Sequence, residues 1–165
     1  MEIYIKSLEG VKRYIRQNPN LPNDYLFISI NNYTHWNGQY EEHPPFTDDQ
    51  LASDNVLPLW FDDTTPNENL DNHYCLFDEN DVKVIIDFLN KNVVKETKGI
   101  VVHCTAGISR SGAVGSVLND YYNRFLEDNE KQWEDNQLHN YENCISPNPH
   151  VASLLKKALG MSYNS

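Results

Sequence analysis

One stretch near the middle of the chain is informative at almost every position: His103-Cys104-Thr105-Ala106-Gly107-Ile108-Ser109-Arg110-Ser111. An apolar run, residues 99–102, precedes it, and residues 111–125 follow it with the pattern of a helix. This order predicts a strand, a tight loop and a helix N-terminus. The backbone N–H groups of such a loop point into one concavity, and the helix dipole adds about half a positive charge there. We therefore expect the loop to bind an anion.

Cys104 and Arg110 stand six positions apart in this stretch. The planar guanidinium of Arg110 can bind two oxygens of a phosphate or sulfate at once, while Cys104 can attack the bound group. Only the thiolate attacks, and a free cysteine has a pKa of roughly 8.5. Because the loop amides, the helix N-terminus and Arg110 all favour the thiolate, we expect a pKa of roughly 3.5 to 7.5. The pair predicts a nucleophile for phosphoryl transfer.

Two neighbours of this pair have supporting roles in the prediction. We interpret His103 as the end of the strand, with its ring held by backbone groups so that it orients the loop, rather than as a general base. Ser111 is placed to donate a hydrogen bond to the sulfur, which would help the cysteine to leave when a phosphocysteine intermediate breaks down.

The whole stretch resembles the signature loop of the cysteine-dependent protein tyrosine phosphatases, HCxxGxxR followed by Ser or Thr, and it is most similar to the dual-specificity branch. The resemblance covers residues 56–122. The sequence Phe61-Asp62-Asp63 is similar to that of small bacterial and viral members of the same phosphatase superfamily. It implies a phosphocysteine intermediate on Cys104 without metal or cofactor. It also implies that the substrate phosphate is held by Thr105, Ala106, Gly107, Ile108, Ser109 and Arg110.

The reaction also needs an acid, because transfer to a thiolate leaves an alkoxide or phenoxide. The adjacent Asp62 and Asp63 follow an apolar run and open a loop. In dual-specificity phosphatases the acid follows a strand whose inward apolar residues lie two and four positions before it, and Phe61 and Leu59 then select Asp63. Asp62 remains the alternative acid, because a small shift of the loop can exchange the roles of two neighbouring carboxylates. Both could instead only cap or solvate a turn.

The rest of the chain alternates between strand and helix patterns. Strands are predicted at residues 25–30, 55–61 and 99–102, helices after the N-cap residues Ser7 and Asp78, and a last helix that starts at Asn148-Pro149. The last helix stops at Gly160 and has an inward stripe of Val151, Leu154, Leu155, Ala158 and Leu159. The acidic residues 127–143 form either a solvated helix or an insertion loop. We expect an α/β fold: a single three-layer αβα domain over residues 1–165, with a central, mostly parallel sheet of four to five strands.

Charge and composition restrict the partners. The formal net charge of −11 argues against nucleic acid and anionic membrane surfaces. Because no signal peptide or membrane span is visible, we expect a soluble, cytoplasmic protein, which we expect to be a monomer. Three cysteines without a CxxC spacing, and histidines without ligand spacing, argue against a disulfide framework and a metal site.

The substrate class follows from the loop interior. Relatives that act on inositol lipids place lysines there, whereas this loop has none. The favoured hypothesis is a protein phosphatase that hydrolyses phosphotyrosine, with phosphoserine and phosphothreonine as further substrates. The alternatives are a catalytically weak phosphate-binding interaction module and a phosphatase acting on a non-protein phosphomonoester. Tyr33 and Trp36 either stack on a phosphotyrosyl ring or only pack under a loop. The sequence does not predict which residues of 31–50 line the pocket.

Overall fold

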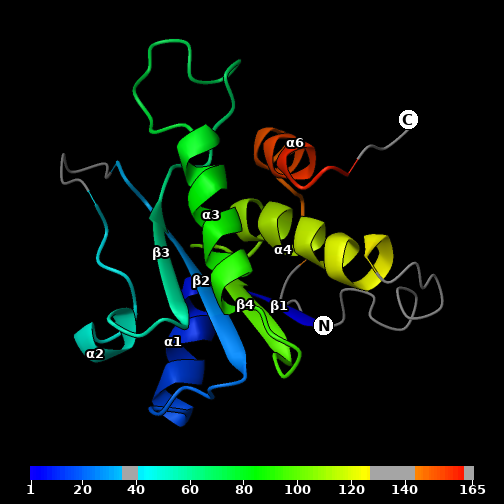
Figure 1. Ribbon diagram of the computed structural model, residues 1–165. Coiled ribbons are helices and arrows are strands. Elements are labelled where there is room, and N and C mark those ends of the chain that lie inside the picture. Colours follow the sequence, from blue (N-terminus) through cyan, green and yellow to red (C-terminus); the bar gives the residue numbers. More distant parts are fainter. Residues whose placement is uncertain (35–40, 127–143, 162–165) are drawn as a thin grey trace.

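A computed structural model describes residues 1–34, 41–126 and 144–161 of the chain (Figure 1). The strands and helices follow one another in this order: β1 (Glu2–Lys6), α1 (Leu8–Gln17), β2 (Tyr25–Asn31), α2 (Asp48–Leu51), β3 (Val56–Trp60), α3 (Glu79–Asn92), β4 (Gly99–His103), α4 (Arg110–Asp120), the π-helix η1 (Tyr121–Phe125) and α6 (Pro149–Ala158). The chain is therefore an α/β protein, as predicted.

The central sheet has four strands in the order β1-β4-β2-β3, and all neighbouring pairs are parallel. In register, His103 at the end of β4 pairs with Lys6 of β1 on one side and with Ser29 of β2 on the other. Because the carboxyl ends of parallel strands meet at one edge of a sheet, the loops that follow these strands meet there. This edge positions the site described below.

Strand β1 is the element of the sheet that the sequence patterns did not single out. Its residues alternate, with Ile3 and Ile5 buried and Glu2 exposed. The strand lies at the edge of the sheet, paired with β4 alone. A half-buried strand of five residues has this period of two, so the alternation was the available signal.

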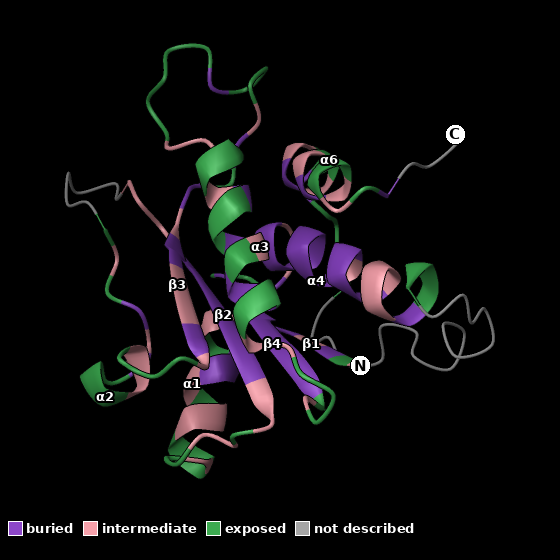
Figure 2. Cartoon of the chain, in the orientation of Figure 1, coloured by how far each residue is buried: buried purple, intermediate pink, exposed green. Residues whose placement is uncertain are grey.

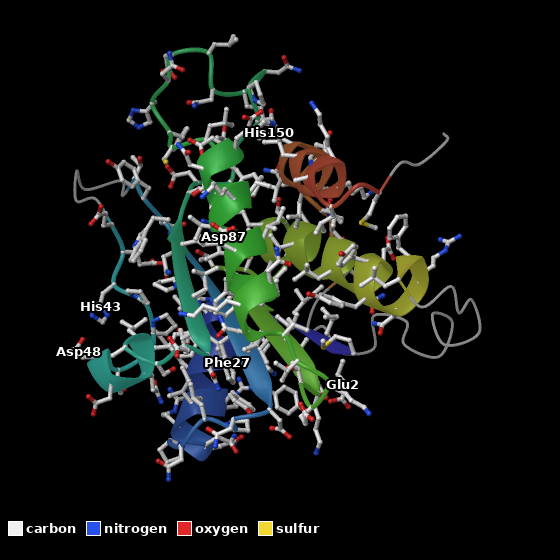
Figure 3. The ribbon with its side chains drawn as sticks, in the orientation of Figure 1. Glu2, Phe27, His43, Asp48, Asp87 and His150 are labelled. Carbon is white, nitrogen blue, oxygen red and sulfur yellow. The ribbon has the colours of Figure 1, made fainter. Side chains whose placement is uncertain are left out.

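Helices cover both faces of the sheet and make three layers. On one face, α3, α4 and α6 enclose a core with residues from all four strands, including Ile3, Ile28, Leu59 and Ile100. On the other face, Val11 of α1 packs with Phe27, which Figure 3 labels beside α1. Figure 2 shows β2, β4 and most of α4 as buried. The nearly continuous apolar character of the inner strands reflects this burial on both faces.

The predicted helix starts are confirmed at their caps. The side chains of Ser7, Asp78 and Asn148 each accept a hydrogen bond from backbone N–H groups of the first turn. The last helix differs at one position: Ala158 is exposed, because the buried stripe of α6 is narrow and consists of Val151 and Leu155. The prediction for residues 127–143 lies outside the described residues. Within the described ranges, no helix is both long and apolar enough to cross a membrane.

Candidate active site

The loop of residues 104–109, called the phosphate loop below, connects β4 to α4 at the carboxyl edge of the sheet. Its carbonyl groups are bonded to neighbouring segments: Thr105 O accepts from Leu8 N at 3.0 Å, and Ile108 O accepts from Ser146 N at 3.1 Å. With these carbonyls turned outward, amide groups of the loop can face the cysteine. Gly107 N donates to Cys104 Sγ at 3.3 Å. The loop is therefore arranged to surround an anion with donors.

Gly107 is required by the backbone at this point. Its φ is +71°, a conformation that favours glycine. A Cβ atom added there would lie 2.7 Å from Ser7 N and 2.8 Å from the carbonyl carbon of Lys6. The phosphate loop thus packs directly on the connection between β1 and α1.

Cys104 lies at the bottom of the loop and is 2% exposed. Its Sγ is 3.1 Å from Ser111 Oγ, in the first turn of α4. Burial raises the pKa of the thiol, but hydrogen bonds from Ser111, the charge of Arg110 and the amide of Gly107 outweigh it, so that the pKa lies below its ordinary value. The local chemistry favours a thiolate.

Arg110 is the first residue of α4, and its guanidinium is buried against the site. Nη1 donates to Phe61 O at 2.9 Å and Nη2 to Thr105 Oγ1 at 3.1 Å. Nε is buried and has no hydrogen-bond partner among the described residues. Because a buried donor needs an acceptor, this N–H is available to a bound oxyanion, which is the acceptor that a guanidinium binds best.

His103 is held by a chain of polar side chains inside the sheet. Its Nδ1 is 3.1 Å from Cys104 O, and its Nε2 is 2.6 Å from Ser29 Oγ. Since a carbonyl only accepts, Nδ1 donates and Nε2 accepts from Ser29. Asn31 Nδ2 in turn donates to Ser29 Oγ at 3.2 Å. Burial and, to a smaller extent, the charge of Arg110 together lower the pKa of His103 to about 4, against the hydrogen bond to Cys104. The ring is therefore neutral at pH 7.

Ser29 and Asn31 were not found from the sequence. They lie at the end of an apolar strand, two positions apart, and both are fully buried. The pairing of β2 with β4 brings Ser29 beside His103, and Asn31 contacts Ser29. A polar pair inside an otherwise apolar strand was the available signal, since buried polar groups need partners.

The two adjacent carboxylates have different surroundings. Asp62 is 5% exposed and is bound to backbone: Oδ1 accepts from Tyr33 N and Thr34 N, each at 3.1 Å, and Oδ2 accepts from Cys75 N at 2.8 Å. These three hydrogen bonds hold together the segments that follow β2 and β3. Asp62 is thus surrounded by backbone donors.

Asp63 is exposed and points to the phosphate loop. Its Oδ1 accepts from Ser109 Oγ at 2.7 Å and from Asn148 Nδ2 at 2.9 Å. Cys104, Arg110, Ser111 and Asp63 therefore meet at one edge of the sheet, although Asp63 follows β3 and the other three follow β4.

The other predicted loop residues lie nearer the surface than Cys104 and Arg110. Thr105 and Ala106 are exposed, while Ile108 and Ser109 are half-buried. Tyr33 is half-buried and has its amide on Asp62, whereas Trp36 lies outside the described residues. Across the described ranges, no three His, Cys, Asp or Glu side chains are grouped so that they could hold a metal ion.

No protein-family model matches the chain, and no curated protein matches it. Among solved structures, the chain is similar to the crystal structure of the Cydia pomonella PTP-2 phosphatase, with 18% sequence identity and a TM-score of 0.46. The match covers 91% of this chain and 78% of that chain.

Proposed function

We propose that the chain is a cysteine-dependent phosphatase that hydrolyses phosphotyrosine in proteins. The observation that carries this proposal is the pairing of a buried, hydrogen-bonded Cys104 sulfur with a buried Arg110 Nε that has no partner among the described residues. A thiolate and an unpaired guanidinium N–H at the two ends of one loop fit the attack on a phosphate monoester.

In the first step, the Cys104 thiolate attacks phosphorus in line, while Arg110 and the loop amides hold the equatorial oxygens. The S–P bond forms as the P–O bond to the leaving group breaks. Asp63 gives its proton to the departing phenol oxygen. Its position against Ser109, at the rim of the phosphate loop, supports this role.

In the second step, water attacks the phosphocysteine. Asp63, now a carboxylate, takes a proton from this water, and the S–P bond breaks. The hydroxyl of Ser111, 3.1 Å from Sγ, donates to the sulfur and stabilises the thiolate as it leaves. No step requires a metal ion or a cofactor.

The substrate class is a phosphorylated side chain with a single phosphate. The phosphate loop has no lysine for additional phosphates, and the net charge of −11 disfavours polyanions. Phosphotyrosine is the first candidate, with phosphoserine and phosphothreonine as further ones. A reducing compartment such as the cytoplasm suits the free thiol, and we expect the enzyme to act as a monomer.

An aryl phosphate assay in the presence of a chelator tests the proposal. We expect phosphate release by the wild type, none by Cys104→Ser, and unchanged release by the matched control Cys75→Ser, which alters a half-buried cysteine. Acid quenching during turnover should trap a phosphate on Cys104 that mass spectrometry detects. Activity that survives Cys104→Ser would overturn the mechanism.

The two alternatives predict different results. A binding module would retain a phosphotyrosyl peptide without releasing phosphate. An enzyme for small molecules would cleave nucleoside or sugar monophosphates faster than phosphopeptides. For the proposed enzyme, the double variant Cys104→Ser, Asp63→Ala should capture phosphorylated proteins from cells.

A further inference from the structure

Asn148 contacts both loops of the candidate site. It is 3% exposed, and its backbone N–H donates to Ser109 O in the phosphate loop at 3.0 Å. Its side-chain Nδ2 donates to Asp63 Oδ1 at 2.9 Å and to Thr64 O at 3.0 Å. One residue thus connects the loop of the nucleophile with the loop of the carboxylate.

The orientation of this amide is determined by its other end. Asn148 Oδ1 accepts from His150 N at 3.0 Å and from Val151 N at 3.2 Å, which makes it the N-cap of α6. The oxygen therefore faces two donors, and the nitrogen faces a carboxylate and a carbonyl. A flipped amide would lose all four hydrogen bonds, so the nitrogen is held toward Asp63.

The choice of oxygen on Asp63 has a chemical consequence. Both Asn148 Nδ2 and Ser109 Oγ reach the same atom, Oδ1. A protonated carboxyl carries one proton, and an oxygen that already accepts two hydrogen bonds is the poorer place for it. The proton of the acid form therefore belongs on Oδ2, the oxygen that has neither of these two donors.

We propose that Asn148 is a positioning residue for proton transfer: by holding Oδ1 of Asp63 it presents the proton on Oδ2 to the leaving group. This inference rests on the proposed function. Because Asp63 is exposed, its side chain has rotamer freedom that these contacts remove. Without Asn148, the Ser109 hydroxyl would be the remaining side-chain donor to Oδ1 of Asp63. Ser109 itself belongs to the phosphate loop.

A second contact ties the same end of α6 to the segment that follows β3, and it provides a control. His150 Nε2 donates to Phe77 O at 2.7 Å, and Figure 3 shows His150 at the start of α6, beside the upper end of α3. This contact does not include Asp63. A variant of His150 therefore perturbs the start of α6 without removing a hydrogen-bond donor from Oδ1 of Asp63.

The test compares leaving groups. General acid catalysis matters for a poor leaving group such as phenol and little for a dinitrophenol, which leaves without a proton. Asn148→Ser keeps an N-cap oxygen for α6 but removes the amide donor. We expect kcat/KM for phenyl phosphate to fall about 10- to 100-fold, a part of the roughly 10²- to 10⁴-fold that a general acid contributes, and the value for dinitrophenyl phosphate to change less than about twofold. His150→Gln should change kcat/KM for neither substrate.

A double variant separates positioning from folding. If Asn148 acts through Asp63, then Asn148→Ser combined with Asp63→Asn is no slower on phenyl phosphate than Asp63→Asn alone. The inference would be overturned if Asn148→Ser lowered kcat/KM equally for phenyl phosphate and dinitrophenyl phosphate, or changed neither value. Additive losses in the double variant would also overturn it. These results require an active wild type. A wild type without Cys104-dependent phosphatase activity is a different result, which overturns the proposed function together with this inference.

Discussion

Asp63 Oδ1 accepts a hydrogen bond from Ser109 Oγ at 2.7 Å, so the side chain that follows β3 touches the loop that follows β4. Asp62, its neighbour, points instead into backbone donors from two other segments. Thr64 N donates to Asp62 O at 3.1 Å, so the chain turns tightly at Asp63, and this turn separates a carboxylate at the phosphate loop from one inside the fold.

Isosteric amides at the two aspartates should have different effects. Asp63→Asn keeps an oxygen for Ser109 and Asn148 but has no acidic proton, so turnover of phenyl phosphate should fall about 10²- to 10⁴-fold at unchanged stability. Asp62→Asn turns an NH₂ group toward a backbone donor, so the free energy of unfolding should fall by about 2 kcal/mol. Steady-state kinetics and urea unfolding measure both. A larger kinetic loss in a stably folded Asp62→Asn would transfer the acid role to Asp62.

The thiol of Cys104 should be alkylated as a thiolate at neutral pH. Since hydrogen bonds from Ser111 contribute to its lowered pKa, Ser111→Ala should move the midpoint of the pH-rate profile to higher pH. The profile is measured with iodoacetate, whose carboxylate suits an anion site, and peptide mapping locates the label. Inorganic phosphate should slow the reaction at Cys104.

Cys75 is the internal control for this experiment. Burial raises the pKa of its thiol, and the carboxylates of Asp81, Asp62 and Asp78 raise it further. Its labelling should therefore need higher pH than that of Cys104, without protection by phosphate. Identical pH profiles for the two cysteines would contradict the thiolate assignment.

Two glycines with the same backbone conformation should respond differently to alanine. Gly107 and Gly160 both have a φ of +71°, but an added Cβ meets the backbone of Lys6 and Ser7 at Gly107 and nothing within 4 Å at Gly160. Gly160→Ala should cost about 1–2 kcal/mol of unfolding free energy from the backbone conformation alone. Gly107→Ala should cost more and also abolish activity, because the loop must move. Urea unfolding and the aryl phosphate assay check this, and equal effects would show that crowding at the loop is unimportant.

Protonation of His103 should destabilise the fold in mild acid. Burial lowers its pKa to about 4, whereas the unfolded chain has the ordinary value of about 6.5. Between these values only the unfolded state binds the proton, so the contribution of the neutral ring is complete above about pH 6.5 and is lost as the pH falls toward 4. By about pH 5 the loss should be on the order of 2 kcal/mol.

The measurement is the difference between the wild type and His103→Asn, which keeps a donor for Cys104 O but does not titrate. This comparison is needed because Asp81, whose pKa burial raises to about 6, titrates in the same range with the opposite effect on stability. Urea unfolding at about pH 7.5 and about pH 5 should show the smaller loss in the variant. Equal losses would mean that His103 is protonated in the folded state.

Much of the fold could be predicted because it depends on local patterns. The caps at Ser7, Asp78 and Asn148 precede their helices directly, and the inner strands are continuous apolar runs. Strand β1 was missed because an edge strand shows only an alternation over five residues, which is short enough to occur by chance. Ala158 was predicted inward, but periodicity gives the direction of a helix face and not the width of the surface that covers it.

By itself, the sequence determined that a cysteine and an arginine are joined by a tight loop between a strand and a helix, because a strand, a loop and a helix start within a dozen residues are governed by local backbone geometry. Only the tertiary structure decided which of Asp62 and Asp63 faces that loop, and that Ser29 and Asn148 support it. The physical reason is distance along the chain: the hydrogen bond between Asp63 and Asn148 joins residues 85 positions apart, and the one between Ser29 and His103 joins residues 74 apart. Contacts of that kind exist only after the parallel strands have brought their carboxyl ends together.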